Sequence, residues 1–379
     1  MSGFDGFLGN EELKARLRRD IAAKRLSHAY MIEGPRGSGK NTLAKLIAAA
    51  VACDEPDPPC MDCVNCRKIL SGQSPDVITV EADKDKVQLG VDVIRRLRDD
   101  AVFAANDLDV KVYIFPAADT MNIQAQNALL KLLEEPPVGV MFLLLTENAQ
   151  GLLPTIRSRA PLLRLETLDD KTISSWLTEN DADAAALKLD DPKAFDVAVR
   201  LSGGSLGAAM ELCSPESSEE CMRLWRCADK LVRLLSERGT SRSNLEFHEY
   251  ASKLTSAIQP PKGRPEKKAE ETKPSRTGAG RTPSAAQNTK SPPKNQRAEL
   301  SDVYSLIADA ARDLIAAKLA RDFRPLFYTA TEDADELSSK FPAARLMRLA
   351  DGAQKAMDGL SKNMNIGLVQ SEFAVYVVS

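Results

Sequence analysis

The residues of this chain that can do chemistry begin with a glycine-rich pattern, G-x-x-x-x-G-K, which runs from Gly34 to Lys40. Glycines let successive backbone N–H groups converge on an anion at the start of a helix, and the lysine reaches the β and γ phosphates. The next position should carry Ser or Thr, whose hydroxyl binds Mg²⁺, but it is Asn41 here. The pattern therefore predicts a degenerate phosphate loop that has lost a metal ligand. Its residues are Gly34, Gly37, Gly39, Lys40, Asn41 and Thr42.

Four cysteines supply a second kind of chemistry, with the spacing C-x₆-C-x₂-C-x₂-C. Four thiolates satisfy tetrahedral Zn²⁺, and each C-x₂-C step brings neighbouring sulfurs into one coordination sphere. Four protein ligands leave no open position, so the pattern favours a structural zinc ion. The alternative is a set of free buried thiols. The predicted ligands are Cys53, Cys60, Cys63 and Cys66.

Strands and helices must alternate around these residues. Ile32–Ala52 has the pattern of a buried strand, a glycine turn and a long helix. Further strands are predicted at residues 76–81, 111–115 and 140–145, and helices at residues 91–103 and 123–133, where prolines stop the second helix. Alternation over 150 residues predicts an α/β fold, with a parallel sheet covered by helices on both faces.

Composition excludes several classes of protein. The chain has 379 residues and a net charge of −3, so no strong overall field attracts nucleic acid or membranes. It has no run of 18 apolar residues, and its N-terminus lacks the apolar core of a signal peptide. We expect a cytoplasmic protein without a membrane partner, in which clustered cysteines bind metal and do not form disulfides.

The rest of the chain is predicted to be helical apart from one segment. Residues 259–299 are rich in proline and lysine and contain no Val, Ile, Leu or aromatic residue. Such a segment cannot bury a core, and we expect it to be a disordered linker. Helical periodicity returns at residues 301–323 and 343–360.

Three stretches together resemble a known family: SHAYMIEGPRGSGKNTLAKLIAAAVAC, KVYIFPAADTMNIQAQNALLKLLEEPP and FLLLTENAQGLLPTIRSR. They resemble the bacterial DNA polymerase III clamp-loader subunits of the AAA+ superfamily, and among these the delta-prime group, a relative of the gamma/tau motor subunits. The resemblance covers roughly residues 3–213. It implies an AAA+ P-loop-like domain at 1–165 with a zinc module at 53–66, a helical lid at 166–213, and a helical collar at 214–258 and 300–379, with 259–299 as the linker.

Departures from the family pattern argue against ATP hydrolysis. The motor members follow the third strand with Asp-Glu, which holds the Mg²⁺ shell and positions water, but Pro116 and Ala117 stand there. Asp119 is displaced by two residues. The sensor arginine of the motor's G-S-x-R pattern is replaced by Gly207. Phosphoryl transfer depends almost wholly on positioning and charge stabilisation, so these losses predict no turnover.

The arginine motif of the family is retained. Ile156-Arg157-Ser158-Arg159-Ala160 matches its Ser-Arg-Cys pattern except at Ala160. In the family, this arginine reaches the ATP site of the adjacent motor subunit, so the resemblance gives Arg159 the role of an arginine finger in trans. A guanidinium suits that role because it is permanently charged and contacts two phosphate oxygens at once. The alternative is a surface arginine that caps a helix. The resemblance also makes Thr146 sensor-like, at the end of the fourth strand.

The sequence thus predicts a non-catalytic, delta-prime-like subunit of the clamp loader, a component of the DNA polymerase III holoenzyme. Its implied partners are the gamma/tau and delta subunits, the sliding clamp indirectly, and primer–template DNA through the complex. Structural Zn²⁺ is expected, and binding of ATP or ADP without hydrolysis is left open. Two alternatives remain: an ATP-hydrolysing gamma/tau-type motor, and a stand-alone zinc- and nucleotide-binding regulator.

Overall fold

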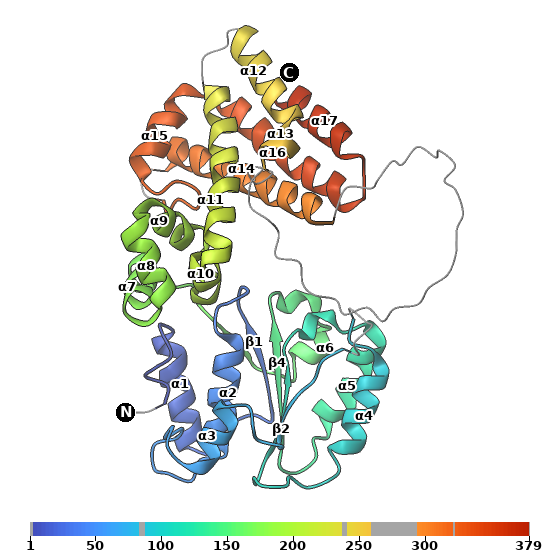
Figure 1. Cartoon of the computed structure of the whole chain (residues 1–379). Helices are drawn as coiled ribbons and strands as arrows, with labels where there is room; N and C mark the ends of the chain where they lie inside the picture. Colours follow the sequence, from blue (N-terminus) through green and yellow to red (C-terminus); the bar gives the residue numbers. More distant parts are fainter. Residues whose placement is uncertain (1–2, 83–87, 237–240, 259–293, 321–322, 379) are drawn as a thin grey trace, which may run out of the picture. The chain divides into compact units, whose positions relative to one another are not determined.

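The computed structural model describes residues 3–82, 88–236, 241–258, 294–320 and 323–378. The chain forms two compact units (Figure 1). Unit 1 comprises Met1–Asp190 and Ser202–Ser214, and unit 2 comprises Asp191–Leu201 and Pro215–Ser379. Among the described helices, none is long and apolar enough to cross a membrane.

Within the described residues, unit 1 is built on five parallel strands in the order β2-β3-β4-β1-β5. All residues of β3 and β4 are buried, as expected when helices cover both faces of a parallel sheet. The predicted parallel-sheet α/β class is therefore confirmed. The strands are β1 (Ala29–Glu33), β2 (Val77–Thr79), β3 (Lys111–Phe115), β4 (Val140–Thr146) and β5 (Leu162–Arg164).

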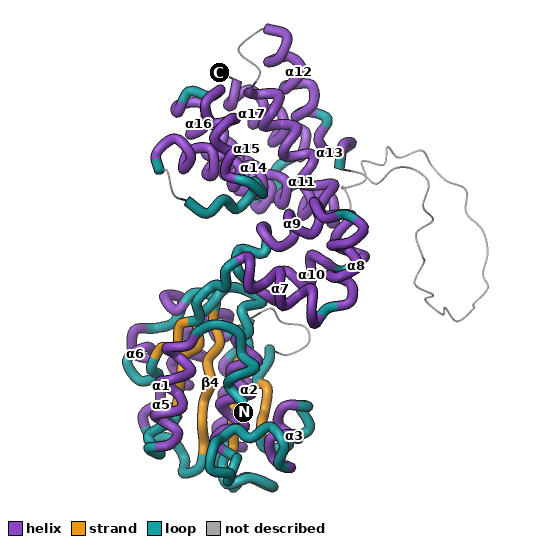
Figure 2. Tube along the Cα trace, turned by 90° about the vertical axis from the view of Figure 1, so that its left-hand side faces the viewer, coloured by secondary structure: helices purple, strands orange, loops and turns teal. Residues whose placement is uncertain are grey.

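Two apolar layers flank this sheet, and Figure 2 shows the strands with helices on both sides. Because successive side chains of a strand point to opposite faces, Tyr30 and Ile32 of β1 enter one layer, while Ala29 and Met31 enter the other. The first layer is covered by α1 (Glu11–Ala22), α2 (Lys40–Val51) and α3 (Val64–Leu70). The second is covered by α4 (Val91–Asp100), α5 (Ile123–Glu134) and α6 (Pro154–Arg157).

Three more helices complete unit 1: α7 (Asp170–Asn180), α8 (Ala182–Asp190) and α10 (Leu206–Cys213). Helix α7 packs on α8, and α10 contacts both. Two short 3₁₀ turns, η1 (Ala118–Thr120) and η2 (Ala149–Gly151), follow β3 and β4. Helix α9 (Pro192–Leu201), although it lies inside the predicted lid range of 166–213, belongs to unit 2.

Unit 2 is helical and unites chain segments from both sides of residues 259–293. Helix α11 packs on α14, and α12 packs on α17. Trp225 of α11 stacks on Phe327, with ring centroids 5.2 Å apart, and its indole N–H donates to the Phe327 carbonyl at 3.2 Å. Its remaining helices are α11 (Pro215–Ser236), α12 (Ser241–Ser252), α13 (Leu254–Ala257), α14 (Lys294–Leu319), α15 (Thr331–Lys340), α16 (Ala343–Ser361) and α17 (Ile366–Val378).

The predicted linker, 259–299, differs from the structure at its end. Residues 259–293 lie outside the described residues, and α14 begins at Lys294. The first core residues of α14 are Leu300, Val303 and Tyr304, all fully buried. The residues just before them are mostly good helix formers, which lets the helix start about two turns earlier than apolar periodicity indicates.

Candidate functional site

The phosphate loop lies between β1 and α2, at the edge of the sheet where β3 and β4 also end. Gly37 and Gly39 have φ angles of +75° and +88°, a region that glycine adopts readily and other residues rarely do. The Lys40 ammonium donates to the carbonyls of Gly34, at 2.7 Å, and Pro35, at 2.9 Å. The lysine is thus folded onto its own loop, and burial lowers its pKa, against the opposing effect of Glu147 and Asp119.

A cavity of about 760 Å³ adjoins this loop. Its walls include five of the six predicted loop residues, Gly37, Gly39, Lys40, Asn41 and Thr42. The structure therefore brings most of the predicted loop together around one space. From the far side it is lined by Pro116, Ala117, Asp119, Thr120, Leu145 and Glu147.

The two residues that follow β3 carry no carboxylate. Pro116 and Ala117 line the cavity where the motor pattern has Asp-Glu, and neither side chain can bind a metal or accept a proton. Asp119 does reach the cavity wall from η1, as does Glu147 from the segment after β4. Sequence spacing indicated Asp119 only as a neighbour and did not indicate Glu147.

Thr146 is buried at the end of β4 and is not among the residues that line the cavity. Its side chain is 1 % exposed, and its hydroxyl oxygen accepts the Asn148 N–H at 3.0 Å. Its carbonyl accepts the Gly34 N–H at 3.2 Å, which ties β4 to the start of the phosphate loop. These contacts describe a residue that shapes the turn between β4 and η2.

The start of α10 rests directly on the phosphate loop. The Gly207 N–H donates to the Gly37 carbonyl at 3.0 Å, and the Ser205 hydroxyl donates to the Arg36 carbonyl at 2.7 Å. A Cβ atom on Gly207 would lie 2.9 Å from the Gly37 oxygen and 3.0 Å from its Cα. Glycine at the sensor position thus allows a backbone-to-backbone approach that an arginine would prevent.

Gly207→Ala is expected to lower the free energy of unfolding by about 1–2 kcal/mol, because overpacking outweighs the better helix propensity of alanine. Chemical denaturation of the purified chain measures this loss. Gly6→Ala is the matched control, since a Cβ there would meet nothing within 4 Å. Equal stability of the Gly207 variant and the wild type would show that the α10–loop contact is not close-packed.

The segment before α1 covers the other side of the loop. The Phe7 ring is 7 % exposed and lies under Gly39, where an added Cβ would come within 2.9 Å of it. Lys14 is only 4 % exposed and donates to the Phe7 carbonyl at 2.8 Å. The phosphate loop is therefore held between the N-terminal segment and α10.

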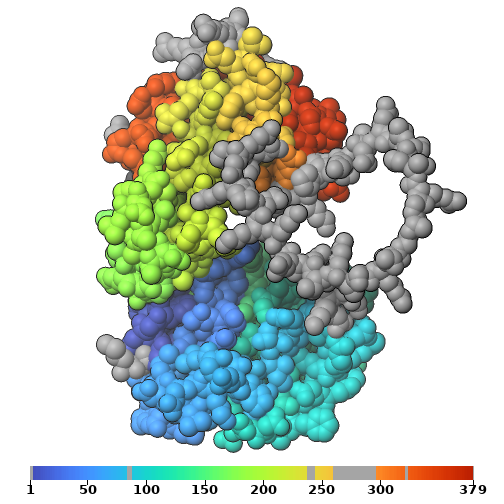
Figure 3. All heavy atoms as spheres, in the orientation of Figure 1, coloured from blue at the N-terminus to red at the C-terminus, as the bar shows by residue number. Residues whose placement is uncertain are grey.

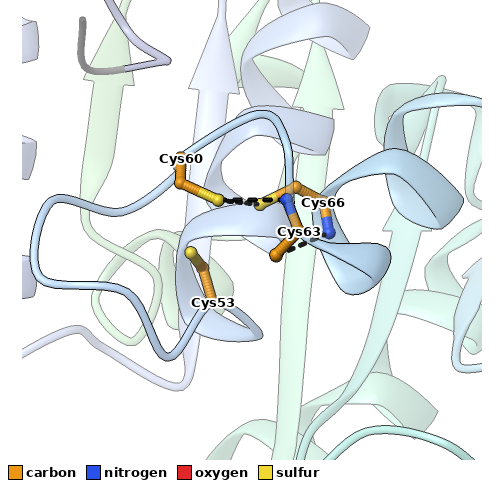
Figure 4. Close-up of side chains that lie close together, drawn as sticks. All are labelled: Cys53, Cys60, Cys63 and Cys66. Carbon is orange, nitrogen blue, oxygen red and sulfur yellow. Dashed lines mark hydrogen bonds between the residues drawn. The ribbon is translucent and has the colours of Figure 1, made fainter.

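The four predicted zinc ligands lie together beside α2 and α3 (Figure 4). Their sulfur atoms all lie within 4.8 Å of one another, and those of Cys60 and Cys66 are 4.0 Å apart. Tetrahedral zinc with bonds of 2.3 Å places sulfurs about 3.8 Å apart, so the cluster fits such an ion with small shifts. The surrounding segment belongs to the light-blue surface of unit 1 in Figure 3.

Backbone N–H groups prepare this cluster for a cation. Those of Cys63 and Cys66 point to the sulfurs of Cys60 and Cys63, at 3.2 and 3.4 Å. Hydrogen bonds from the Cys63 and Asp62 backbone lower the pKa of Cys60 to about 7, so this thiol is partly ionised near neutral pH. Burial raises the pKa of Cys66 and of Cys53. A bound cation would reverse that effect of burial.

Arg159 follows α6 and lies near the C-terminal end of α5, where it contacts Glu134. Its Nη2 is 2.7 Å from the Glu134 carboxylate, and its Nη1 donates to the Thr155 carbonyl at 3.0 Å. The side chain is 35 % exposed. Ala160, which replaces the family's cysteine, is fully buried, so this change leaves the guanidinium's surroundings untouched.

Comparison with known proteins identifies relatives in one group. Residues 9–169 match the family of the DNA polymerase III delta subunit. DNA polymerase III subunit tau of Bacillus subtilis is 35 % identical over 203 residues, 53 % of this chain and 35 % of that protein. Subunit delta′ of Bacillus subtilis is 39 % identical over 166 residues, 44 % of this chain and 50 % of that protein. The matches thus span half or less of these relatives.

One solved structure, a DNA polymerase III gamma-subunit-related protein from Thermotoga maritima, aligns with a TM-score of 0.40 and 16 % identity. The alignment covers 96 % of this chain and 98 % of that one. The sequence matches alone relate this chain to DNA polymerase III subunits, through residues 9–169 for the family and through 203 and 166 residues for subunits tau and delta′.

Proposed function

We propose that this chain, which is similar to DNA polymerase III tau and delta′ subunits over part of its length, is a clamp-loader subunit of the delta-prime kind. In this proposal its AAA+ domain does not hydrolyse ATP. It donates Arg159 to the ATP bound by a neighbouring gamma/tau-type subunit. With a delta-type subunit the complex loads the sliding clamp onto primer–template DNA.

The observation that carries this proposal is the pair Pro116 and Ala117 in the wall of the cavity at the phosphate loop. ATP hydrolysis at such a loop needs Mg²⁺ and a group that positions water, both supplied from this strand end in P-loop enzymes. The two carboxylates that do line the cavity, Asp119 and Glu147, face the Lys40 ammonium. Without a cation they oppose phosphate binding there.

The sequence relationship does not separate delta-prime from the tau motor, since both are relatives. The site residues favour delta-prime. Asn41, Pro116–Ala117 and Gly207 each remove one part of the hydrolytic machinery, while Arg159, the part that acts on another subunit, stays exposed. A motor subunit would need to keep the hydrolytic residues that this chain lacks.

Zinc has a structural role in this proposal. Cys53 lies at the end of α2, the helix that begins at Lys40, and Cys66 lies within α3. When bound, the ion would cross-link α2 and α3 through four thiolates without touching the phosphate cavity. The Gly3 N–H donates to the Pro59 carbonyl at 2.8 Å, so the segment between Cys53 and Cys60 also anchors the N-terminal segment that covers the phosphate loop.

ATP hydrolysis by the purified chain, with primer–template DNA present, tests the central part of the proposal. We expect the rate of the wild type to equal that of Lys40→Ala, because neither holds a catalytic Mg²⁺. Turnover by the wild type that is lost in Lys40→Ala would contradict the proposal. It would mean that Asp119 and Glu147 have replaced the missing pair, and that the chain is a motor subunit.

A further inference from the structure

Arg159 is held from two sides. Glu134, on α5, contacts Nη2 at 2.7 Å, and Nη1 donates to the Thr155 carbonyl at 3.0 Å and the Ser158 hydroxyl at 3.3 Å. A guanidinium has five N–H groups in a planar fork, so these three contacts leave donors for a further anion. The Glu134 side chain is 47 % exposed, which places the pair at the surface of unit 1.

Glu134 occupies an electrostatically unfavourable position in its helix. It is the last residue of α5, whose C-terminal end carries the negative pole of the helix dipole. A carboxylate is unfavourable there, and the common choice is Lys, Arg or His. Residues that break a local rule in this way tend to serve a site, and the cation that Glu134 contacts is Arg159.

The backbone around Arg159 is fixed to the same helix. Gln126 of α5 is 4 % exposed, and its side-chain oxygen accepts the Leu153 N–H at 2.8 Å, just before α6. Its amide nitrogen donates to the Met121 carbonyl at 3.0 Å. Ile156 and Ala160, on either side of the arginine motif, are fully buried. These contacts hold the backbone without Glu134, so the carboxylate acts on the guanidinium and not on the backbone.

We propose that Glu134 is the positioning residue for Arg159. This inference rests on the proposed function, in which Arg159 contacts a phosphate of the neighbouring subunit's ATP. Arginine carries large rotamer freedom, which must be lost when it meets the phosphate. A carboxylate that already holds one edge of the fork removes part of that loss and directs the other edge outward.

The reconstituted complex with Glu134→Ala in this chain tests the proposal. We expect kcat at the neighbouring ATP site, measured under single-turnover conditions, to fall about fivefold, the fold-change that matches the strongest exposed ion pairs. The Kd for ATP should not change, because Arg159 acts in the transition state. Glu134→Gln keeps an acceptor oxygen and should restore part of the rate. Glu135→Ala is the matched control, since Glu135 is the next residue and is also exposed.

A second comparison separates this inference from the proposed function. On an Arg159→Ala background, Glu134→Ala should have no further effect, because the two residues act as one unit. A loss in that background, or an unchanged or raised kcat for Glu134→Ala alone, would overturn the positioning role while leaving Arg159 in place. If Arg159→Ala itself leaves kcat unchanged, the proposed function fails, and the positioning role fails with it.

Discussion

Arg159→Ala is expected to reduce ATP hydrolysis at the neighbouring site by about 10²-fold or more while this chain still folds and assembles. Arginine fingers contribute about 10³–10⁵ in rate to phosphoryl transfer in related reactions, and single preorganised donors about 10²–10³. The guanidinium is 35 % exposed, and the buried residues beside it, Ile156 and Ala160, are unchanged, so removing it should cost the chain little stability. Single-turnover ATP hydrolysis by the reconstituted complex, which resolves this site from the others, measures the effect.

Arg157→Ala is the matched control for that experiment. Arg157 lies two residues earlier, on α6, and donates to the Gln150 side chain. Loss of an arginine at this position keeps the charge change and the local helix but leaves Arg159 paired with Glu134. An equal loss of rate in both variants would mean that the surface as a whole matters and not the Arg159 guanidinium.

Metal removal is expected to have the second large effect. We expect about one Zn²⁺ per chain and a loss of several kcal/mol in the free energy of unfolding when Cys66 is replaced by serine. Zinc binding contributes directly to folding, with apparent values of about 10–16 kcal/mol in zinc-finger peptides. In a unit of this size, each kcal/mol corresponds to about 2–4 °C in Tm. Metal analysis and thermal denaturation measure the two quantities.

Cys221→Ser provides the control for the zinc experiment. Cys221 is a cysteine of α11 in unit 2, outside the four-thiol cluster. This variant should retain the zinc content of the wild type. A folded, metal-free wild-type chain would contradict the metal site, as would a Cys66→Ser variant with unchanged zinc content and Tm. The four cysteines would then be free thiols.

The parts of the fold that sequence predicts well are those set by local pattern. Strand β3 has the predicted bounds, 111–115, because a fully buried parallel strand is a continuous apolar run. Helix α5 begins at its predicted residue, 123, since Asn122 caps its start by accepting the Ala125 N–H. The cysteine cluster and most of the phosphate loop come together as their spacing indicates.

Other features depend on contacts that no local pattern records. Strand β5 lies outside the predicted strands because three residues at a sheet edge carry no periodicity. The burial of Lys14 depends on the Phe7 carbonyl, and the approach of Gly207 depends on the absence of a side chain at Gly37. Glu134 would have been assigned to a solvated helix end. Its pairing with Arg159 links positions far apart in sequence and needs the packed structure.

The central claim is that this chain completes the ATP site of a neighbouring subunit and hydrolyses no ATP at its own phosphate loop. Single-turnover hydrolysis of labelled ATP by the reconstituted complex tests this claim most directly, because its amplitude counts the sites that hydrolyse ATP. The account predicts that Arg159→Ala lowers the amplitude of the fast phase by one site per complex, with ATP binding unchanged. A fast phase of unchanged amplitude and rate would contradict it.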